Sequence, residues 1–167
     1  RTTLLMRTDL DPETNDALLV EALTTTTVVL IAGADTLASH SGQSAFVTAA
    51  LLMARCGHKV WLDAPDVDLV GAQPPLRRGH LIGELGRVGD DLLPDWRFQI
   101  GCPAPSVDAA VTFGAAAWEG EARQHVTLNA DDWSADLGGV ADQWRGREWP
   151  IGGLAAGALA AAEVFKI

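Results

Sequence analysis

VVLIAGADTLASHSGQSAFVTAALLMARCGHKVWLDAPD, residues 28–66, is the stretch that decides the fold of this chain. It opens with a continuous aliphatic run, residues 28–31, which is typical of a strand buried on both faces of a parallel sheet. Gly33 ends that run. An apolar pattern at helical spacing follows over residues 45–56, and it stops at Gly57, a residue suited to the left-handed conformation just past a helix end.

A second hydrophobic strand, residues 59–62, follows this helix and closes on Asp63. Strand, small-residue loop, helix and strand together predict a βαβ unit of the mononucleotide-binding type. Because neighbouring parallel strands end on the same rim of a sheet, we expect Gly33 and Asp63 to share one rim. The predicted fold class is therefore α/β, a Rossmann-like three-layer fold with a mostly parallel sheet.

The remaining elements follow from periodicity and turn residues. We predict a helix after Asp11, a helix within residues 77–93, strands at residues 96–100 and 107–113, an antiparallel hairpin over residues 125–137, and an Ala-rich helix over residues 151–167. The last helix is apolar almost all round and is shorter than the roughly 20 residues that cross a bilayer. We therefore expect it to be buried in the core.

Composition and charge narrow the class of protein. The length suits one domain, residues 1–167. The first residue is Arg1 and Ile167 falls inside a helical pattern, so we expect a piece cut from a longer chain. A net charge of −10 argues against nucleic acid and against anionic membranes as partners. With no secretory signal at the start, we predict a cytoplasmic protein.

The loop between the first strand and its helix is the candidate binding site. Unpaired backbone N–H groups at a helix N-terminus attract phosphate. A dinucleotide fingerprint needs three glycines, however, and residues 33–38 keep only Gly33, while Asp35 adds a negative charge. Residues 39–43 are a second candidate loop for binding an anion. The carboxylate of Asp63 is suited to accept hydrogen bonds from ribose hydroxyls. We therefore expect this segment to be a structural remnant that binds no nucleotide, and a nucleotide site is the alternative.

The cysteines and histidines of the chain indicate no metal site and no catalytic site. Cys56 and Cys102 form no CxxC pair, so we expect buried free thiols and no zinc. The histidines lack an i, i+4 partner, and we assign no metal ligand. His40 shares its loop with serines and Asp35, so a Ser-His-Asp hydrolase is conceivable, but G-x-S-x-G is absent. We assign no catalytic residue.

Residues 149–166, WPIGGLAAGALAAAEVFK, resemble the segment Asn-Pro-x-Gly-x-x-x-Ala-(small)-Glu-Val-Phe-Lys of ThiF-family proteins, relatives of the ubiquitin-activating, MoeB-type and HesA-type adenylyltransferases. Asp63, Asp66 and Val67 also resemble the Asp-x-Asp-x-Val that ends a strand in that family. The resemblance covers most of residues 28–166.

The resemblance implies a protein that uses ATP and magnesium to adenylate a ubiquitin-like or sulfur-carrier protein and works as a dimer. It would place the loop from Gly33 to Ser39 against the phosphates and Arg77 or Arg78 on the triphosphate. The full set of residues expected to bind the nucleotide is Gly33, Asp35, Thr36, Ser39, Ser41, Gly42, Asp63, Arg77 and Arg78.

Departures from the family pattern bear on activity. The glycine-rich loop is lost, Trp149 stands where the family has Asn, and no zinc pair is present. We therefore expect a degenerate, N-terminal half that serves dimerisation or docking, as a homo-oligomer or against a partner domain of the same chain. An active nucleotide-binding adenylyltransferase domain is the alternative.

Overall fold

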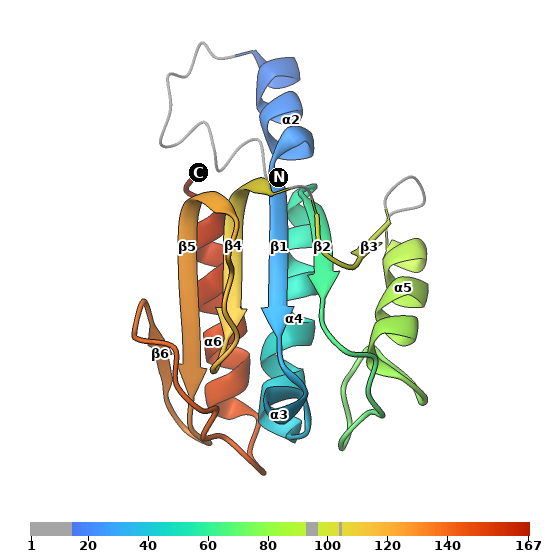
Figure 1. Ribbon diagram of the computed structural model, residues 1–167. Helices are drawn as coiled ribbons and strands as arrows, with labels where there is room; N and C mark the ends of the chain where they lie inside the picture. The colour runs from blue at the N-terminus through green and yellow to red at the C-terminus, as the bar shows by residue number, and fades with distance from the viewer. Residues whose placement is uncertain (1–14, 93–96, 104) are drawn as a thin grey trace.

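The structure is a computed structural model that describes residues 15–92, 97–103 and 105–167. A six-stranded sheet runs in the order β3-β2-β1-β4-β5-β6 (Figure 1). The strands are β1 Thr27–Ala32, β2 Lys59–Asp63, β3 Gln99–Ile100, β4 Ser106–Phe113, β5 Glu121–Ala130 and β6 Ala135–Leu137. The helices are α2 Asp16–Thr25, α3 Ala34–Leu37, α4 His40–Cys56, α5 Leu81–Leu92 and α6 Ile151–Val164.

The pairing confirms the predicted α/β fold class with a mostly parallel sheet and an antiparallel hairpin. All strand pairs are parallel except β5 with β6, which are antiparallel. The chain starts at the central strand β1, adds β2 and β3 on one side, and then crosses to β4 and β5 on the other side. This order makes the carboxyl ends of β1 and β4 a topological switch point, where open α/β sheets bind their ligands.

Several element boundaries differ from the sequence-based prediction. α4 begins at His40 rather than near Ala45, because the side chain of Ser39 caps the helix by accepting a hydrogen bond from Gly42 N. β3 has only two residues. α2 starts at Asp16, where the side chain of Asn15 accepts a hydrogen bond from Ala17 N at 2.9 Å. The predicted start after Asp11 lies outside the described residues.

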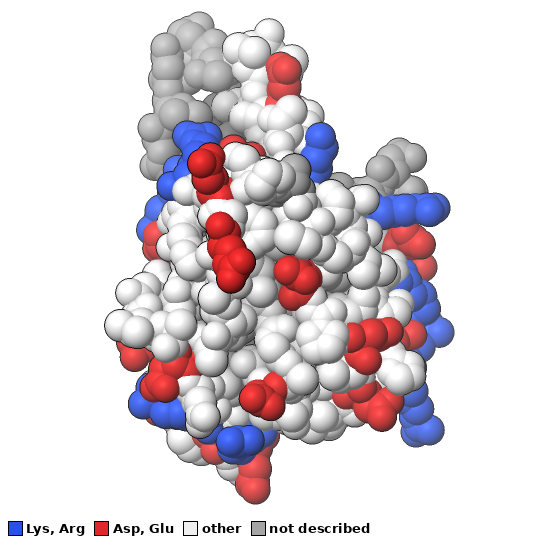
Figure 2. All heavy atoms as spheres, in the orientation of Figure 1, with Lys and Arg blue, Asp and Glu red and all other residues white. Residues whose placement is uncertain are grey.

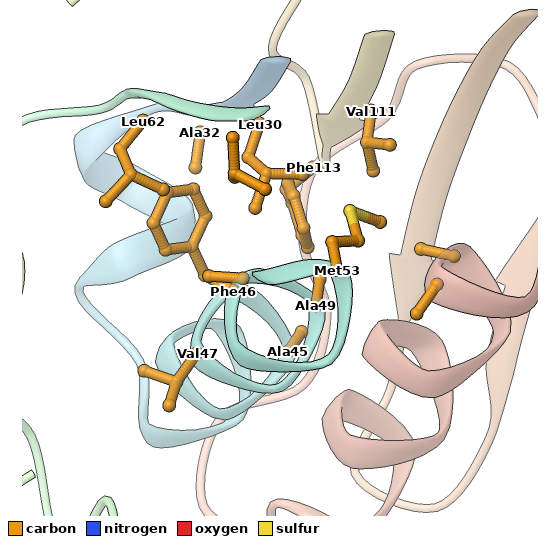
Figure 3. Close-up of a cluster of buried hydrophobic side chains, with 14 of the residues drawn as sticks. Leu30, Ala32, Ala45, Phe46, Val47, Ala49, Met53, Leu62, Val111 and Phe113 are labelled. Carbon is orange, nitrogen blue, oxygen red and sulfur yellow. The ribbon is translucent and has the colours of Figure 1, made fainter. Parts of the chain in front are cut away.

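The main core lies between the sheet and helices α4, α5 and α6. Phe46 of α4 is fully buried, and its ring centroid lies 5.4 Å from that of Phe113 of β4. Figure 3 shows Phe46 and Met53 of α4 pointing towards the strands that carry Leu30 and Val111. The continuous aliphatic character of β1 reflects burial on both faces, since Val28 and Val29 are both fully buried.

Glycines bring α6 against α4. A Cβ on Gly157 would lie 2.4 Å from the carbonyl oxygen of Ala45, and one on Gly153 would lie 2.2 Å from that of Ser41. Both separations are shorter than real Cβ contacts. Gly152, Gly153, Ala156, Gly157, Ala160, Ala161 and Val164 form the buried inner side of α6. The prediction that this helix is buried in the core therefore holds for its inner side alone, because the opposite side faces solvent.

The other face of the sheet is covered by a loop. The β4–β5 connection, residues 114–120, crosses this face, and its Trp118 packs near Val29 and Ile31 of β1. Figure 2 shows this face with Asp and Glu side chains over its middle and Lys and Arg towards its edges. None of the helices in the described residues is long and apolar enough to cross a membrane.

Candidate functional site

Gly33 and Asp63 lie on the same rim of the sheet, which confirms that part of the prediction. β1 and β2 pair in parallel with Ile31 opposite Asp63. Gly33 follows β1 directly and is the N-cap of the short helix α3. The predicted loop therefore does sit at the carboxyl ends of the strands.

The second small-residue cluster forms the first turn of α4. Ser39 caps this helix, because its Oγ accepts a hydrogen bond from Gly42 N and donates one to Thr36 O, each at 3.0 Å. Gly42 is required at this point, since a Cβ there would lie 2.0 Å from the Thr36 carbonyl oxygen. Ser39 and Ser41 are both buried. The cluster is thus folded tightly against α3.

The chain itself covers the N-terminus of α4. A Cβ on Gly146 would lie 2.4 Å from Ser41 Oγ, so the loop before α6 passes directly over Ser41. The His40 ring lies between this same loop and the loop after β2, with Nδ1 3.2 Å from Glu148 O and Nε2 3.0 Å from Ala72 O. Ser41 and Gly42 therefore do not form an open anion cradle, and neither ring nitrogen of His40 is left for a serine nucleophile.

Gln43 is a buried polar residue of α4 whose side chain hydrogen-bonds to the backbone of two other segments. Its side chain is fully buried and its Nε2 donates to Leu37 O at 2.9 Å and to Asp68 O at 2.8 Å. Its Oε1 accepts from Val70 N at 2.8 Å. The amide thus fixes the loop between β2 and α5 to α4. This role of Gln43 could not be predicted from the sequence, because a single glutamine belongs to no recognisable motif.

Arg77 and Arg78 lie exposed in the loop between β2 and α5. The backbone N–H of Arg77 donates to Glu84 Oε2 at 2.8 Å. Within residues 15–92, 97–103 and 105–167, no hydrogen bond or ion pair joins either guanidinium to Asp35, Ser39 or Asp63. The structure therefore provides no direct link between the predicted arginines and the rest of the predicted nucleotide site.

A hollow of about 270 Å³ opens at the topological switch point. We call it the switch-point hollow, and its lining residues are Asp35, Thr36, Ala38, Ala115, Gln143, Trp144 and Arg147. Asp35 and Thr36 follow β1, Ala115 follows β4, and the others come from the loop before α6. Only Asp35 and Thr36 were predicted, because nothing in the sequence brings residues 143–147 to this rim.

Trp144 is the aromatic residue among those that line the hollow. It is 5 % exposed, and its ring centroid lies 6.5 Å from that of Phe113. Its Nε1 is buried and has no hydrogen-bond partner among the described residues. A buried donor left unpaired costs about 1–3 kcal/mol, and because this N–H is itself buried it is not open to a ligand in the hollow.

Acidic side chains fix the loop that carries the hollow. Asp131 accepts hydrogen bonds from Trp133 N at 2.8 Å and from Ser134 N at 2.6 Å, and these bonds hold the pKa of its carboxyl below the usual range. Asp132 Oδ1 accepts from Arg147 N at 2.6 Å. In the described part of the chain, no group of three His, Cys, Asp or Glu side chains could hold a metal ion.

A second candidate surface lies on the solvent side of α6. We call it the outer face of α6, and it consists of Ile151, Leu154, Ala155, Ala158, Leu159 and Ala162, all exposed. No polar residue interrupts residues 151–162. Next to it in the chain, the exposed Trp149 stacks on Trp133 with ring centroids 5.8 Å apart. Such a contiguous apolar stripe is typical of an interaction surface.

The two cysteine thiols are more exposed to solvent than predicted. Cys102 is exposed and Cys56 is only partly buried, and both are free. Cys102 lies beyond β3 at the sheet edge, where no layer covers it, so the expectation of two buried thiols was wrong.

A family comparison replaces the resemblance to ThiF proteins. The family model for the BilD N-terminal domain matches residues 27–167. No curated protein matches the chain. The assignment to ThiF, MoeB or HesA proteins was wrong, because it rested on a short Ala-rich helix and on βαβ features that unrelated Rossmann-like domains share.

ATP, magnesium and a ubiquitin-like or sulfur-carrier partner followed chiefly from that resemblance. They stay predictions that no feature described above tests. The match begins at the first residue of β1 and runs through the sheet, the switch-point hollow and α6. It covers most of the chain, and the protein belongs to the BilD N-terminal domain family.

Proposed function

We propose that this chain is a non-catalytic Rossmann-like docking domain that binds another folded unit through the outer face of α6. One observation carries the proposal. The helix is packed against α4 on its glycine side, yet Ile151 and Leu154 are each 46 % exposed and Leu159 is 43 % exposed. A surface helix of a domain that works alone normally turns polar residues to water.

The occupant that we propose is a following part of the same polypeptide. The family is described as an N-terminal domain, which implies further chain in its members. The net charge of −10 disfavours a second copy of this chain, because like-charged surfaces repel each other. The stacked pair Trp133 and Trp149 beside the helix supplies aromatic anchors of the kind that carry binding energy in interfaces.

Nucleotide binding is the weaker of the two functions predicted from the sequence. The N-terminus of α4 is covered by the loop at Gly146 and by α6, which counts against phosphate binding at that helix. The cytoplasmic location stays part of this proposal. The free thiols Cys56 and Cys102 support it, since disulfides form mainly in oxidising compartments.

The test compares Leu154→Lys in the isolated chain and in the full-length protein. Leu154 is exposed in the isolated chain, so the substitution should leave its thermal unfolding nearly unchanged. In the full-length protein it should lower the melting temperature and raise hydrogen exchange along α6. Leu92→Lys is the matched control, because Leu92 is a similarly exposed leucine at the end of α5, at the other edge of the sheet.

Two outcomes would overturn the proposal. The first is full-length protein in which Leu154→Lys behaves like Leu92→Lys. The second is an isolated chain that sediments as a dimer and becomes a monomer on Leu154→Lys, which would make a second copy the occupant.

A further inference from the structure

We propose that the unit docked on the outer face of α6 contacts it through a single α-helix, which lays large apolar side chains over a strip of alanines. The inference rests on the proposed function, because it names the kind of element that occupies the surface already assigned to docking. Docking alone does not require a helix, since a sheet or an extended segment can also cover an apolar helix face.

The outer face of α6 has an alanine strip at its centre. The strip consists of Ala155, Ala158 and Ala162, all exposed. One residue turns about 100° around a helix axis, because a turn contains about 3.6 residues, and this spacing puts the strip within about 30° of the midline of the face. The same spacing puts Leu154 and Leu159 about 70° to either side of that midline. Two exposed leucines therefore flank a strip of methyl groups.

The small side chains of the alanine strip favour a narrow partner. A methyl group adds little to the radius of the helix, so an element that fits between Leu154 and Leu159 can come close to the α6 backbone. Helices packed through small side chains lie at the short end of the usual range of about 8–10 Å between axes. A sheet is a broad layer, so it would rest on the two leucines and leave the alanines without contacts, which forfeits dispersion energy.

The inner side of α6 already admits a helix through small residues. Gly153 and Gly157 let α4 approach so closely that a Cβ on either residue would meet backbone carbonyl oxygens of α4. Alanines take the place of these glycines on the outer side, so a helix there lies farther from the axis of α6 than α4 does. α6 is then the middle helix of three, with small side chains on both of its contact sides.

The composition of the outer face defines the contacting side of the partner helix. Residues 151–162 contain no charged or hydrogen-bonding side chain, so polar groups placed against them would lose water without gaining a partner. The face is about 17 Å long from Ile151 to Ala162, or about three turns. We therefore expect about three or four apolar residues on the partner, at spacings of three and four. Large side chains suit these positions, because they fill the space that alanines leave.

The experiment maps the partner in full-length protein. The photoreactive residue benzoylphenylalanine replaces Leu154 or Ala158, and mass spectrometry after irradiation identifies the segment of the polypeptide beyond residue 167 that is cross-linked. Cysteines are then placed one at a time along that segment, together with Ala158→Cys, in protein whose other cysteines are replaced by serine. We expect disulfides at every third or fourth position, the period of a helix, whereas a strand gives every second position.

A second variant tests the close approach of the partner. Ala158 is exposed, so Ala158→Trp should lower the melting temperature of residues 1–167 by at most about 2 °C, through lost helix propensity. In full-length protein it should lower the melting temperature by about 4 °C or more, because the indole takes the place of partner side chains. Ala141→Trp is the matched control, since Ala141 is an exposed alanine of the loop before α6 and lies outside the outer face. Its effect should stay below about 2 °C in both proteins.

The results separate this inference from the docking function. Disulfides at every second position would overturn the helix and leave docking in place. Full-length protein that tolerates Ala158→Trp, while Leu154→Lys lowers its melting temperature, would do the same. The absence of cross-links from both positions to the polypeptide beyond residue 167, or cross-links between two copies of the outer face, would overturn both.

Discussion

Gly157→Ala should destabilise the protein, although alanine is the better helix former. The substitution in the middle of α6 gains about 1 kcal/mol of helix propensity. Its Cβ, however, would lie 2.4 Å from the carbonyl oxygen of Ala45 and 2.9 Å from the Cβ of Thr48, where ordinary contact begins at 3.4 Å. One of these neighbours is backbone and cannot rotate away, so α6 must move off α4 by about 1 Å.

The magnitude follows from the two opposing terms. Overpacking of a close contact costs about 1–3 kcal/mol and sometimes more, and contact with backbone calls for the upper end. After the gain in propensity, we expect a net loss of about 2 kcal/mol in the free energy of unfolding. For a chain of this length that loss lowers the melting temperature by about 4–8 °C.

The matched control is Gly86→Ala in the interior of α5. A Cβ on Gly86 would meet nothing within 4 Å, so the same change should raise the free energy of unfolding by up to about 1 kcal/mol. Urea unfolding followed by far-ultraviolet circular dichroism measures both variants. Gly157→Ala protein that is as stable as the unchanged chain, with Gly86→Ala behaving as expected, would refute the close α4–α6 packing.

Three further predictions concern acid stability, thiol reactivity and nucleotide binding. Hydrogen bonds from Arg87 and from the backbone of Arg77 lower the pKa of Glu84 from 4.5 to about 2, so its ionised form contributes stability above pH 4.5 that is lost as the pH falls towards 2. Glu84→Gln should therefore flatten the acid side of the stability curve in that window, whereas Glu119→Gln in the 114–120 loop should not; equal curves for both would contradict this role. Iodoacetamide should modify the exposed Cys102 before Cys56, because burial raises the pKa of the Cys56 thiol, and mass spectrometry showing the reverse order would contradict the structure. Millimolar ATP with magnesium should produce no saturable heat in calorimetry, since Ser41 and Gly42 are covered; a saturable isotherm would count against that reasoning.

The strands and the end of α4 could be predicted because their signals are local. The aliphatic run of β1 reflects burial on both faces, and Gly57 ends α4 with a φ of 96°, a left-handed value that glycine adopts readily. Topology then placed Gly33 and Asp63 on one rim. These features need no knowledge of which distant residues meet.

The candidate site could be predicted only in part, because distant contacts decide it. The polar residues around Ser41 read as an open loop in sequence, yet Gly146 and Gly153 cover them. Trp144 and Arg147 have no motif, and only the path of the loop before α6 brings them beside Asp35. The apolar character of α6 indicated burial all round, whereas half of it faces solvent.

His40 fastens two segments that are far apart in the chain. One ring nitrogen lies against Ala72 in the loop after β2, and the other lies against Glu148 in the loop before α6. Gly71 also packs on the same ring, where a Cβ would come within 3.1 Å. Because both loops contact one ring, displacement of His40 removes a contact from each of them at once, which couples local opening of the two segments.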